Sequence, residues 1–309
     1  MKMNDRAKII IAAFLMATLF GFSFLASKIG LNTLKENPID LIAYRFLFAA
    51  IILYGLKSFG VIKIDLRGKD LRPILFMSMF YPVLSFTFEI TGINMTSSAE
   101  SGIIISFYPI LTTILGMIVL KEFPQKNKFF FIFLSMFGVF FINVMQKEAE
   151  YSIAGYIILM FSVLFTSIQA VLTRRASLRF KPQEITYIMI ITGAIVFNTV
   201  SLITHLANNS LTHYFTALVN IELLAAISYL AIGSSIIGFF SLNYLYSKLE
   251  VSRISVLANI ATIISIFAGV LILNEVLHWY HYIGAAMILL GAYGANYAPN
   301  QAAKIIRQV

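Results

Sequence analysis

The sequence contains no cysteine, which excludes disulfide bonds, zinc–thiolate sites and cysteine nucleophiles. It is also poor in charge, because Asp, Glu, Lys and Arg together make up only 12% of its 309 residues. Soluble domains carry roughly twice that share. Hydrophobic residues account for 59% of the chain, and the mean hydropathy is +0.86. This composition indicates an integral membrane protein.

The motifs that mark common enzyme classes are missing as well. The sequence has no HExxH, GxSxG or Walker A pattern and no carboxylate pair with catalytic spacing. A membrane enzyme is therefore an alternative that no residues support, and we expect no cofactor and no metal. Without an ATP-binding motif, any uphill transport would have to use an ion or substrate gradient.

The net charge of +9 could indicate a nucleic-acid partner. The Lys and Arg residues, however, lie in short clusters between apolar runs, which is typical of the loops of a membrane protein. We expect membrane lipid around the chain and no nucleic acid.

Segments of about 20 apolar residues, the length that spans a bilayer, recur along the whole chain. The first could pass for a secretory signal, but it is longer than a usual signal core and lacks a clear cleavage site, so we interpret it as a spanning helix. We predict an all-α membrane protein with ten transmembrane helices, at residues 8–27, 41–59, 73–93, 97–119, 128–145, 153–173, 185–205, 222–246, 253–273 and 279–297.

The distribution of cations predicts the orientation of these helices. Of the 23 Lys and Arg residues, only Lys28, Lys35 and Lys147 would lie on the side opposite the N-terminus, and Arg45 lies within the second helix. Positive charge accumulates on the cytoplasmic side of membrane proteins. We therefore expect a multi-pass protein of the cell membrane with both termini in the cytoplasm.

The two halves of the sequence repeat each other. PILTTILGMIVLKEF, which begins at Pro109, matches TIISIFAGVLILNEV, which begins at Thr262, at a constant offset of 153 residues. ENPIDLIAY and FKPQEITYI, which each open a helix, match more loosely. Five helices in each half would make the second copy enter the membrane in the opposite direction. We predict inverted-topology repeats over residues 1–148 and 149–309, an architecture typical of secondary transporters; an old duplication without a transport role is the alternative.

This pattern resembles the drug/metabolite transporter superfamily, and within it the EamA branch, over nearly the whole chain. FGFSFLASKIG with Lys28, YRF with Arg45 and TGINMTSSAESG before the fourth helix carry the resemblance. It implies gradient-driven export of small metabolites or amino acids. It also implies a central cavity lined by helices 1, 3, 4, 6, 8 and 9.

Polar residues recur at helical spacing within the apolar segments, most clearly as the stripe Ser78, Tyr81, Ser85, Glu89 and Gly92. Such residues also serve packing and hydrogen bonding between membrane helices, so both roles stay open for Gln169, Asn243 and Asn259. Pro109 predicts a kink that could shape a pocket or act as a hinge. We predict that the substrate-binding residues are Tyr81, Ser85, Glu89, Tyr108, Gln169, Asn243 and Asn259, and that Glu89, Arg45 and Pro109 act in gating or coupling.

Glu89 is the most informative residue, because a charge inside the membrane is costly and usually functional. It could gain and lose a proton and so couple proton entry to substrate exit. It could instead bind a substrate ammonium group, or simply pair with Arg45, which we place at a similar depth.

The predicted function is export of a small-molecule substrate by a monomer or homodimer that alternates access, with protons as a possible coupling ion. A lipid or lipid-linked-sugar flippase on the same scaffold is the runner-up, although only Arg45 and Lys28 could bind its phosphate. A passive structural or sensory membrane protein is the third alternative.

Overall fold

The computed structural model describes residues 4–34, 37–93, 95–96, 98–145, 152–273 and 277–297. Within those residues the protein is helical and has no strand, so the predicted all-α class is confirmed. The helices are α1 (Asp5–Thr33), α2 (Pro38–Ser58), α3 (Arg72–Ser78), η1 (Met79–Leu84), α4 (Ser85–Ile93), α5 (Ser98–Ile105), α6 (Tyr108–Leu115), η2 (Gly116–Leu120), α7 (Lys126–Met145), α8 (Ile153–Ala176), α9 (Pro182–Ala207), α10 (Leu211–Ala217), α11 (Ile221–Ser228), η3 (Tyr229–Gly238), α12 (Phe239–Lys248), α13 (Val251–Ala258), α14 (Ile260–Leu273) and α15 (Trp279–Tyr297).

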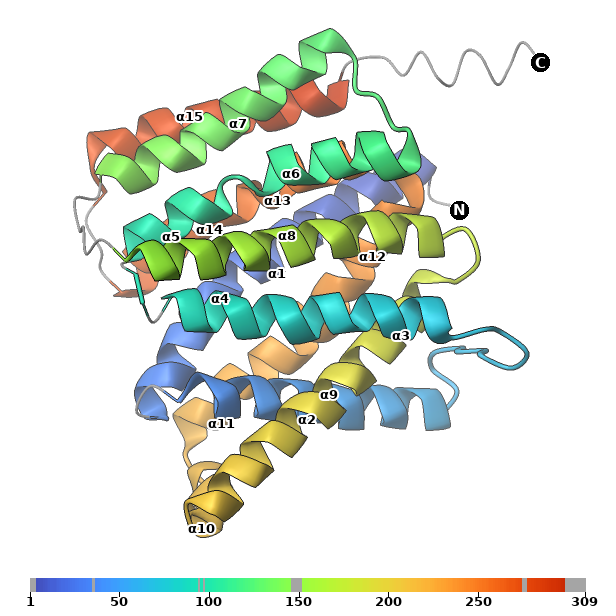
Figure 1. Cartoon of the computed structure of the whole chain (residues 1–309), viewed down its shortest axis with the longest axis vertical. Helices are drawn as coiled ribbons and strands as arrows, with labels where there is room; N and C mark the ends of the chain where they lie inside the picture. The colour runs from blue at the N-terminus through green and yellow to red at the C-terminus, as the bar shows by residue number, and fades with distance from the viewer. Residues whose placement is uncertain are drawn as a thin grey trace.

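Nine helical segments in the described part of the chain are long and apolar enough to span a membrane. Four of them combine shorter helices, namely α3–η1–α4, α5–α6–η2, α11–η3–α12 and α13–α14. The tenth predicted segment is α15, a helix of 19 residues that does not count among the nine. It nevertheless lies alongside α7 at one edge of the bundle (Figure 1).

Two of the composite segments break at a proline. Tyr81 leaves helical geometry, with φ −146° and ψ 120°, directly before Pro82. A proline lacks the N–H that continues a helix, and it disfavours helical geometry in the residue before it. In the same way α5 ends at Ile105, and α6 begins at Tyr108 with Pro109 in its first turn. The kink predicted at Pro109 is therefore present.

Helices α7 and α15 pack closely and run in opposite directions. A Cβ added to Gly284 would meet Ile142, one on Gly291 would meet Ser135, and one on Gly294 would meet Phe131. As the residue number increases along α15, the number of the facing residue decreases along α7, so the two helices are antiparallel. Small residues allow such close approach between membrane helices.

Helices α2 and α9 form a second antiparallel pair at the opposite edge (Figure 1). Asp40 accepts a hydrogen bond from Ser201, whereas Phe46, further along α2, faces Gly193. The sequence repeat matches α2 with α9, and α7 with α15. Because matching helices run in opposite directions in both pairs, the two halves are inverted repeats.

Each end of the α2–α9 pair is closed by a buried carboxylate at the start of one helix. Asp40 Oδ2 lies 2.9 Å from His205 Nε2 near the end of α9. Glu184, in the first turn of α9, accepts from Lys69 Nζ at 2.7 Å and from the backbone N–H of Lys181 at 3.0 Å. Carboxylates are favourable at helix N-termini, which explains why both helix-opening motifs carry one.

Candidate functional site

Arg45 belongs to the first half of the chain, and its side chain forms hydrogen bonds with the second half. Its Nε donates to Ser235 Oγ at 2.7 Å and its Nη2 to Ser234 Oγ at 2.8 Å. Both serines lie in η3, near the middle of the spanning segment Ile221–Lys248. This stretch is π-helical, and such stretches often occur at functional sites.

Three phenylalanine rings surround the Arg45 guanidinium. Its central carbon lies 5.3 Å from the ring centre of Phe86, 5.7 Å from that of Phe46 and 5.8 Å from that of Phe239. These distances allow cation–π attraction, which grows stronger when the cation is removed from water. Arg45 is only 7% exposed, so the serines and the rings together hold a buried cation in a fixed orientation.

The third guanidinium nitrogen of Arg45 is left open. Nη1 has no hydrogen-bond partner among the described residues. It is not fully enclosed either, since the fully enclosed unpartnered side-chain atoms of that part of the chain are Thr18 Oγ1, Asn243 Oδ1 and Arg253 Nη2. One donor of a buried cation therefore borders free space.

Glu89 and Tyr81 belong to the same cluster. Arg45 interacts electrostatically with both of them, and Tyr81 also interacts with Tyr108. In the described part of the chain, Glu89 is partly exposed and forms no hydrogen bond or ion pair, including none with Arg45. Its attraction to Arg45 thus acts over a longer distance than a salt bridge, and its oxygens are not committed to a protein donor.

Tyr108 extends the cluster toward the second half of the chain. Its hydroxyl lies 3.0 Å from the hydroxyl of Tyr246 on α12. Tyr108 opens α6 directly after the break before Pro109. Tyr81, Glu89, Tyr108 and Arg45 therefore lie near one another.

Ser85 and Gln169, two of the other predicted site residues, form hydrogen bonds with protein side chains. Ser85 forms hydrogen bonds with Ser162 and Thr166 on α8. Gln169, 1% exposed, donates to Thr173 one turn further along its own helix. These partners favour the packing role over substrate contact for Ser85 and Gln169.

Asn243 and Asn259 face peripheral helices. The Asn243 amide donates to Thr186 Oγ1 on α9 at 2.8 Å, and the Asn259 amide donates to Ser135 Oγ on α7 at 3.0 Å. Asn243 is fully buried, although its Oδ1 has no partner. Both contacts join helices to one another, so packing is the favoured role here too.

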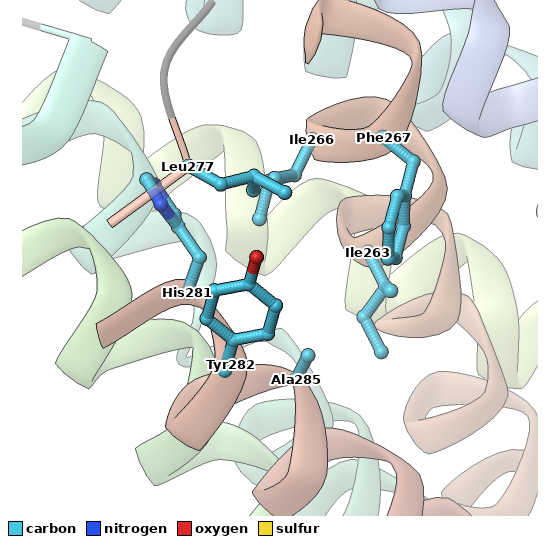
Figure 2. Close-up of a pocket in the computed structure, with 7 residues that line it drawn as sticks. All are labelled: Ile263, Ile266, Phe267, Leu277, His281, Tyr282 and Ala285. Carbon is cyan, nitrogen blue, oxygen red and sulfur yellow. The ribbon is translucent and has the colours of Figure 1, made fainter. Parts of the chain in front are cut away.

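A small cavity away from this cluster lies between α14 and α15. It measures about 20 Å³, enough for roughly one water molecule. Figure 2 shows that apolar side chains make up most of its wall: it is lined by Ile263, Ile266, Phe267, Leu277, His281, Tyr282 and Ala285. It is too small for a metabolite.

The composite helices, the inverted halves and the buried polar cluster can be compared with known proteins. The model of the EamA-like transporter family matches the chain twice, over residues 7–144 and 153–297. The chain belongs to the EamA-like transporter family. The two matches correspond to the two halves of the sequence repeat, and membership makes the protein a multi-pass membrane transporter.

Relatives of this EamA-like transporter cover almost its full length. The uncharacterized transporter YcxC of Bacillus subtilis (strain 168) is 37% identical over 288 residues, covering 93% of this chain and 92% of its own. A protein of Salmonella typhimurium named as a probable amino-acid metabolite efflux pump is 21% identical, with 91% and 92% covered. A solved crystal structure shares the fold, with a TM-score of 0.77 at 16% identity, over 95% of this chain and 99% of that chain.

Proposed function

We propose that this EamA-like transporter exports small amino-acid-like metabolites from the cytoplasm by alternating access, with a proton carried by Glu89 in exchange. The observation that carries the proposal is the open Nη1 of Arg45 beside the uncommitted carboxylate of Glu89.

Opposite charges held apart suit a zwitterionic substrate. A guanidinium binds a carboxylate through directed N–H donors, and a carboxylate attracts an ammonium group. Arg45 has a donor to spare, and Glu89 is near enough for electrostatic interaction without a salt bridge. A zwitterion between them would satisfy both groups at once, whereas a neutral apolar molecule would leave both unpaired.

The aromatic side chains near Arg45 provide an apolar wall for the rest of the substrate. The Tyr81 ring centre lies 5.1 Å from that of Phe86 and 5.6 Å from that of Phe239. Tyr81 and Phe86 are only partly buried. Aromatic faces of this kind suit an apolar or aromatic side group.

The proposed orientation in the membrane rests on the distribution of cations. Loops on the side of the N-terminus carry nearly all Lys and Arg outside the membrane, which supports a cytoplasmic N-terminus in the cell membrane. Proton exchange at Glu89 would let one carboxylate bind a proton and the substrate ammonium in turn. Its lack of a fixed hydrogen-bond donor is compatible with that alternation.

Transport into proteoliposomes tests the proposal. Purified protein would be assayed with a panel of radiolabelled amino acids, organic acids and amines, with and without a pH gradient. We expect uptake of at least one zwitterion, accelerated by the gradient, and no gain for substrates that carry a single charge. Uptake restricted to singly charged compounds, or none across the panel, would overturn the proposal.

Glu89→Gln tests the proposed role of Glu89 in both ammonium binding and proton exchange. It keeps the shape of the side chain but removes both the charge and the titration, so transport driven by the pH gradient should be lost. Glu222→Gln is the matched control, since Glu222 is an exposed carboxylate at the start of α11. Gradient-driven transport by Glu89→Gln at the wild-type rate would remove Glu89 from the mechanism.

A further inference from the structure

An ion pair joins the ends of four spanning segments at the face of the bundle where α1 begins, here called the N-terminal face. Arg174, in the last turn of α8, donates from Nε to Glu122 Oε1 at 2.9 Å. Arg174 Nη1 also donates to the backbone oxygen of Tyr246 on α12 at 2.9 Å. Glu122 Oε2 accepts the N–H of Val251, which opens α13, at 3.0 Å.

The backbone at the end of η2 directs Glu122 to this position. Lys121 adopts the left-handed conformation, with φ 56°, and the N–H of Glu122 returns to the carbonyl of Gly116. Such a turn ends the helix and reverses the direction of the chain. Glu122 thereby reaches the N-terminus of α13, where an anion is favourable.

An apolar cluster closes the bundle between this ion pair and the Arg45 site. It brings together α1, α8, α12 and α13 through Ala12, Met16, Ala170, Val171, Leu242, Leu245, Tyr246, Val251 and Ile254. Met16, Ala170 and Leu245 have no exposed surface. The hydroxyl contact of Tyr108 with Tyr246 adds a polar link between α6 and α12. The N-terminal face is therefore closed in this structure.

We propose that Glu122 and Arg174 are the gating residues of the N-terminal face. This inference rests on the proposed alternating-access function. The N-terminal gate must release Tyr246 and Val251 before α6, α8, α12 and α13 can separate and open the path to Arg45. Weakening one gate favours the state in which that face is open, because a two-state equilibrium shifts toward the state that loses less stabilisation.

Thiol labelling tests this assignment without knowledge of the substrate. The chain has no natural cysteine, so Ala170→Cys introduces a single thiol into the apolar cluster, one turn before Arg174. A membrane-impermeant thiol reagent would be added from the N-terminal side, in inside-out vesicles, and the labelling rate measured. We expect Glu122→Gln and, independently, Arg174→Gln to raise that rate by about tenfold, as for loss of a hydrogen bond between charged groups.

Asp70→Asn is the matched control: Asp70 is a largely exposed carboxylate on the same face as Glu122, and its removal should leave the rate unchanged. Labelling that stays at the parental rate in both Glu122→Gln and Arg174→Gln would overturn the gate.

The labelling experiment tests the gate, whereas the transport experiment tests the proposed function, so either proposal can fail without the other. If labelling responds as expected but no zwitterion is transported, the gate stands and the proposed substrate class falls. If zwitterion transport is found but labelling does not respond, the function stands and the gate falls.

Discussion

Arg45 Nε lies 2.7 Å from Ser235 Oγ, so a side chain of the first repeat is fixed by a hydroxyl of the second. Together with the bond from Nη2 to Ser234, this contact sets the plane of the guanidinium and directs Nη1 away from both serines. The rigid fork of arginine makes such a two-point contact possible, and the single ammonium of lysine does not reproduce it.

Arg45→Lys should therefore lower the initial transport rate by about tenfold or more while the protein remains folded. The reason is that the positive charge persists but the oriented donor is lost, at the usual cost of a hydrogen bond to a charged group. Ser235→Ala is the companion variant, which keeps the guanidinium but removes one of its two supports. It should raise the substrate concentration needed for half-maximal transport and affect the maximal rate less. Equal transport by wild type and Arg45→Lys would exclude a directional role for the guanidinium.

The buried contact between Asp40 and His205 predicts a stability effect at one end of the α2–α9 pair. Asp40 also accepts hydrogen bonds from Ser201 at 2.6 Å and from Asn37 at 2.8 Å. Asp40→Asn should lower the free energy of unfolding by about 2 to 3 kcal/mol, because it weakens several charge-assisted bonds in a buried position. Thermal melting of the detergent-purified protein measures this, with Asp70→Asn as the exposed control. A melting temperature equal to that of wild type would contradict the importance of this contact.

Two glycine-to-alanine substitutions separate close packing from helix propensity. A Cβ on Gly291 would lie 2.6 Å from the Phe131 carbonyl oxygen, whereas one on Gly55 would meet nothing within 4 Å. Gly291→Ala must push α15 away from the α7 backbone and should cost about 1 to 3 kcal/mol. Gly55→Ala should be neutral or slightly stabilising, since alanine favours helix. Thermal melting of both variants decides the point, and equal melting temperatures would show that the contact between α7 and α15 tolerates a methyl group.

Much of the scaffold could be predicted from the sequence, because it depends on local chemistry. Apolar segments of spanning length and proline at position 109 act through their own neighbours, and both are present in the structure. The break at Tyr81 could also be predicted from the sequence, because Pro82 causes it. The regular spacing of the polar residues from Ser78 to Gly92, however, suggested an unbroken helix. The segment therefore does not present the single continuous stripe that the spacing implied.

Other features of the site could not be found by helical periodicity. Consecutive residues of an α-helix point about 100° apart, so a search for one polar face does not place Ser234 and Ser235 together. Both serines lie in the π-helical stretch η3, and both bond Arg45. Glu122 and Arg174 are likewise 52 residues apart, and their pairing depends on how α8 lies against α13 and η2.

Asn243 offers a direct choice between packing and substrate contact. Its Nδ2 donates to Thr186 Oγ1, but its Oδ1 is buried without a partner, and an unpaired buried polar atom is costly. Thr186 Oγ1 itself donates to the Pro182 carbonyl, so it keeps a partner if Asn243 is replaced. Asn243→Leu keeps the branched shape and removes the unpaired oxygen. It should therefore leave the melting temperature unchanged or higher, and keep the transport rate within about twofold of wild type.

Thr186→Val is the matched variant on the other side of the Asn243 contact. It removes the only hydroxyl acceptor of the Asn243 amide, which leaves both polar atoms of a fully buried side chain without an oxygen or nitrogen partner in the described part of the chain. This should cost about 1 to 3 kcal/mol, seen as a lower melting temperature. If instead Asn243→Leu abolishes transport while its melting temperature stays at or above that of wild type, Asn243 contacts the substrate, and the site extends from Arg45 toward α9.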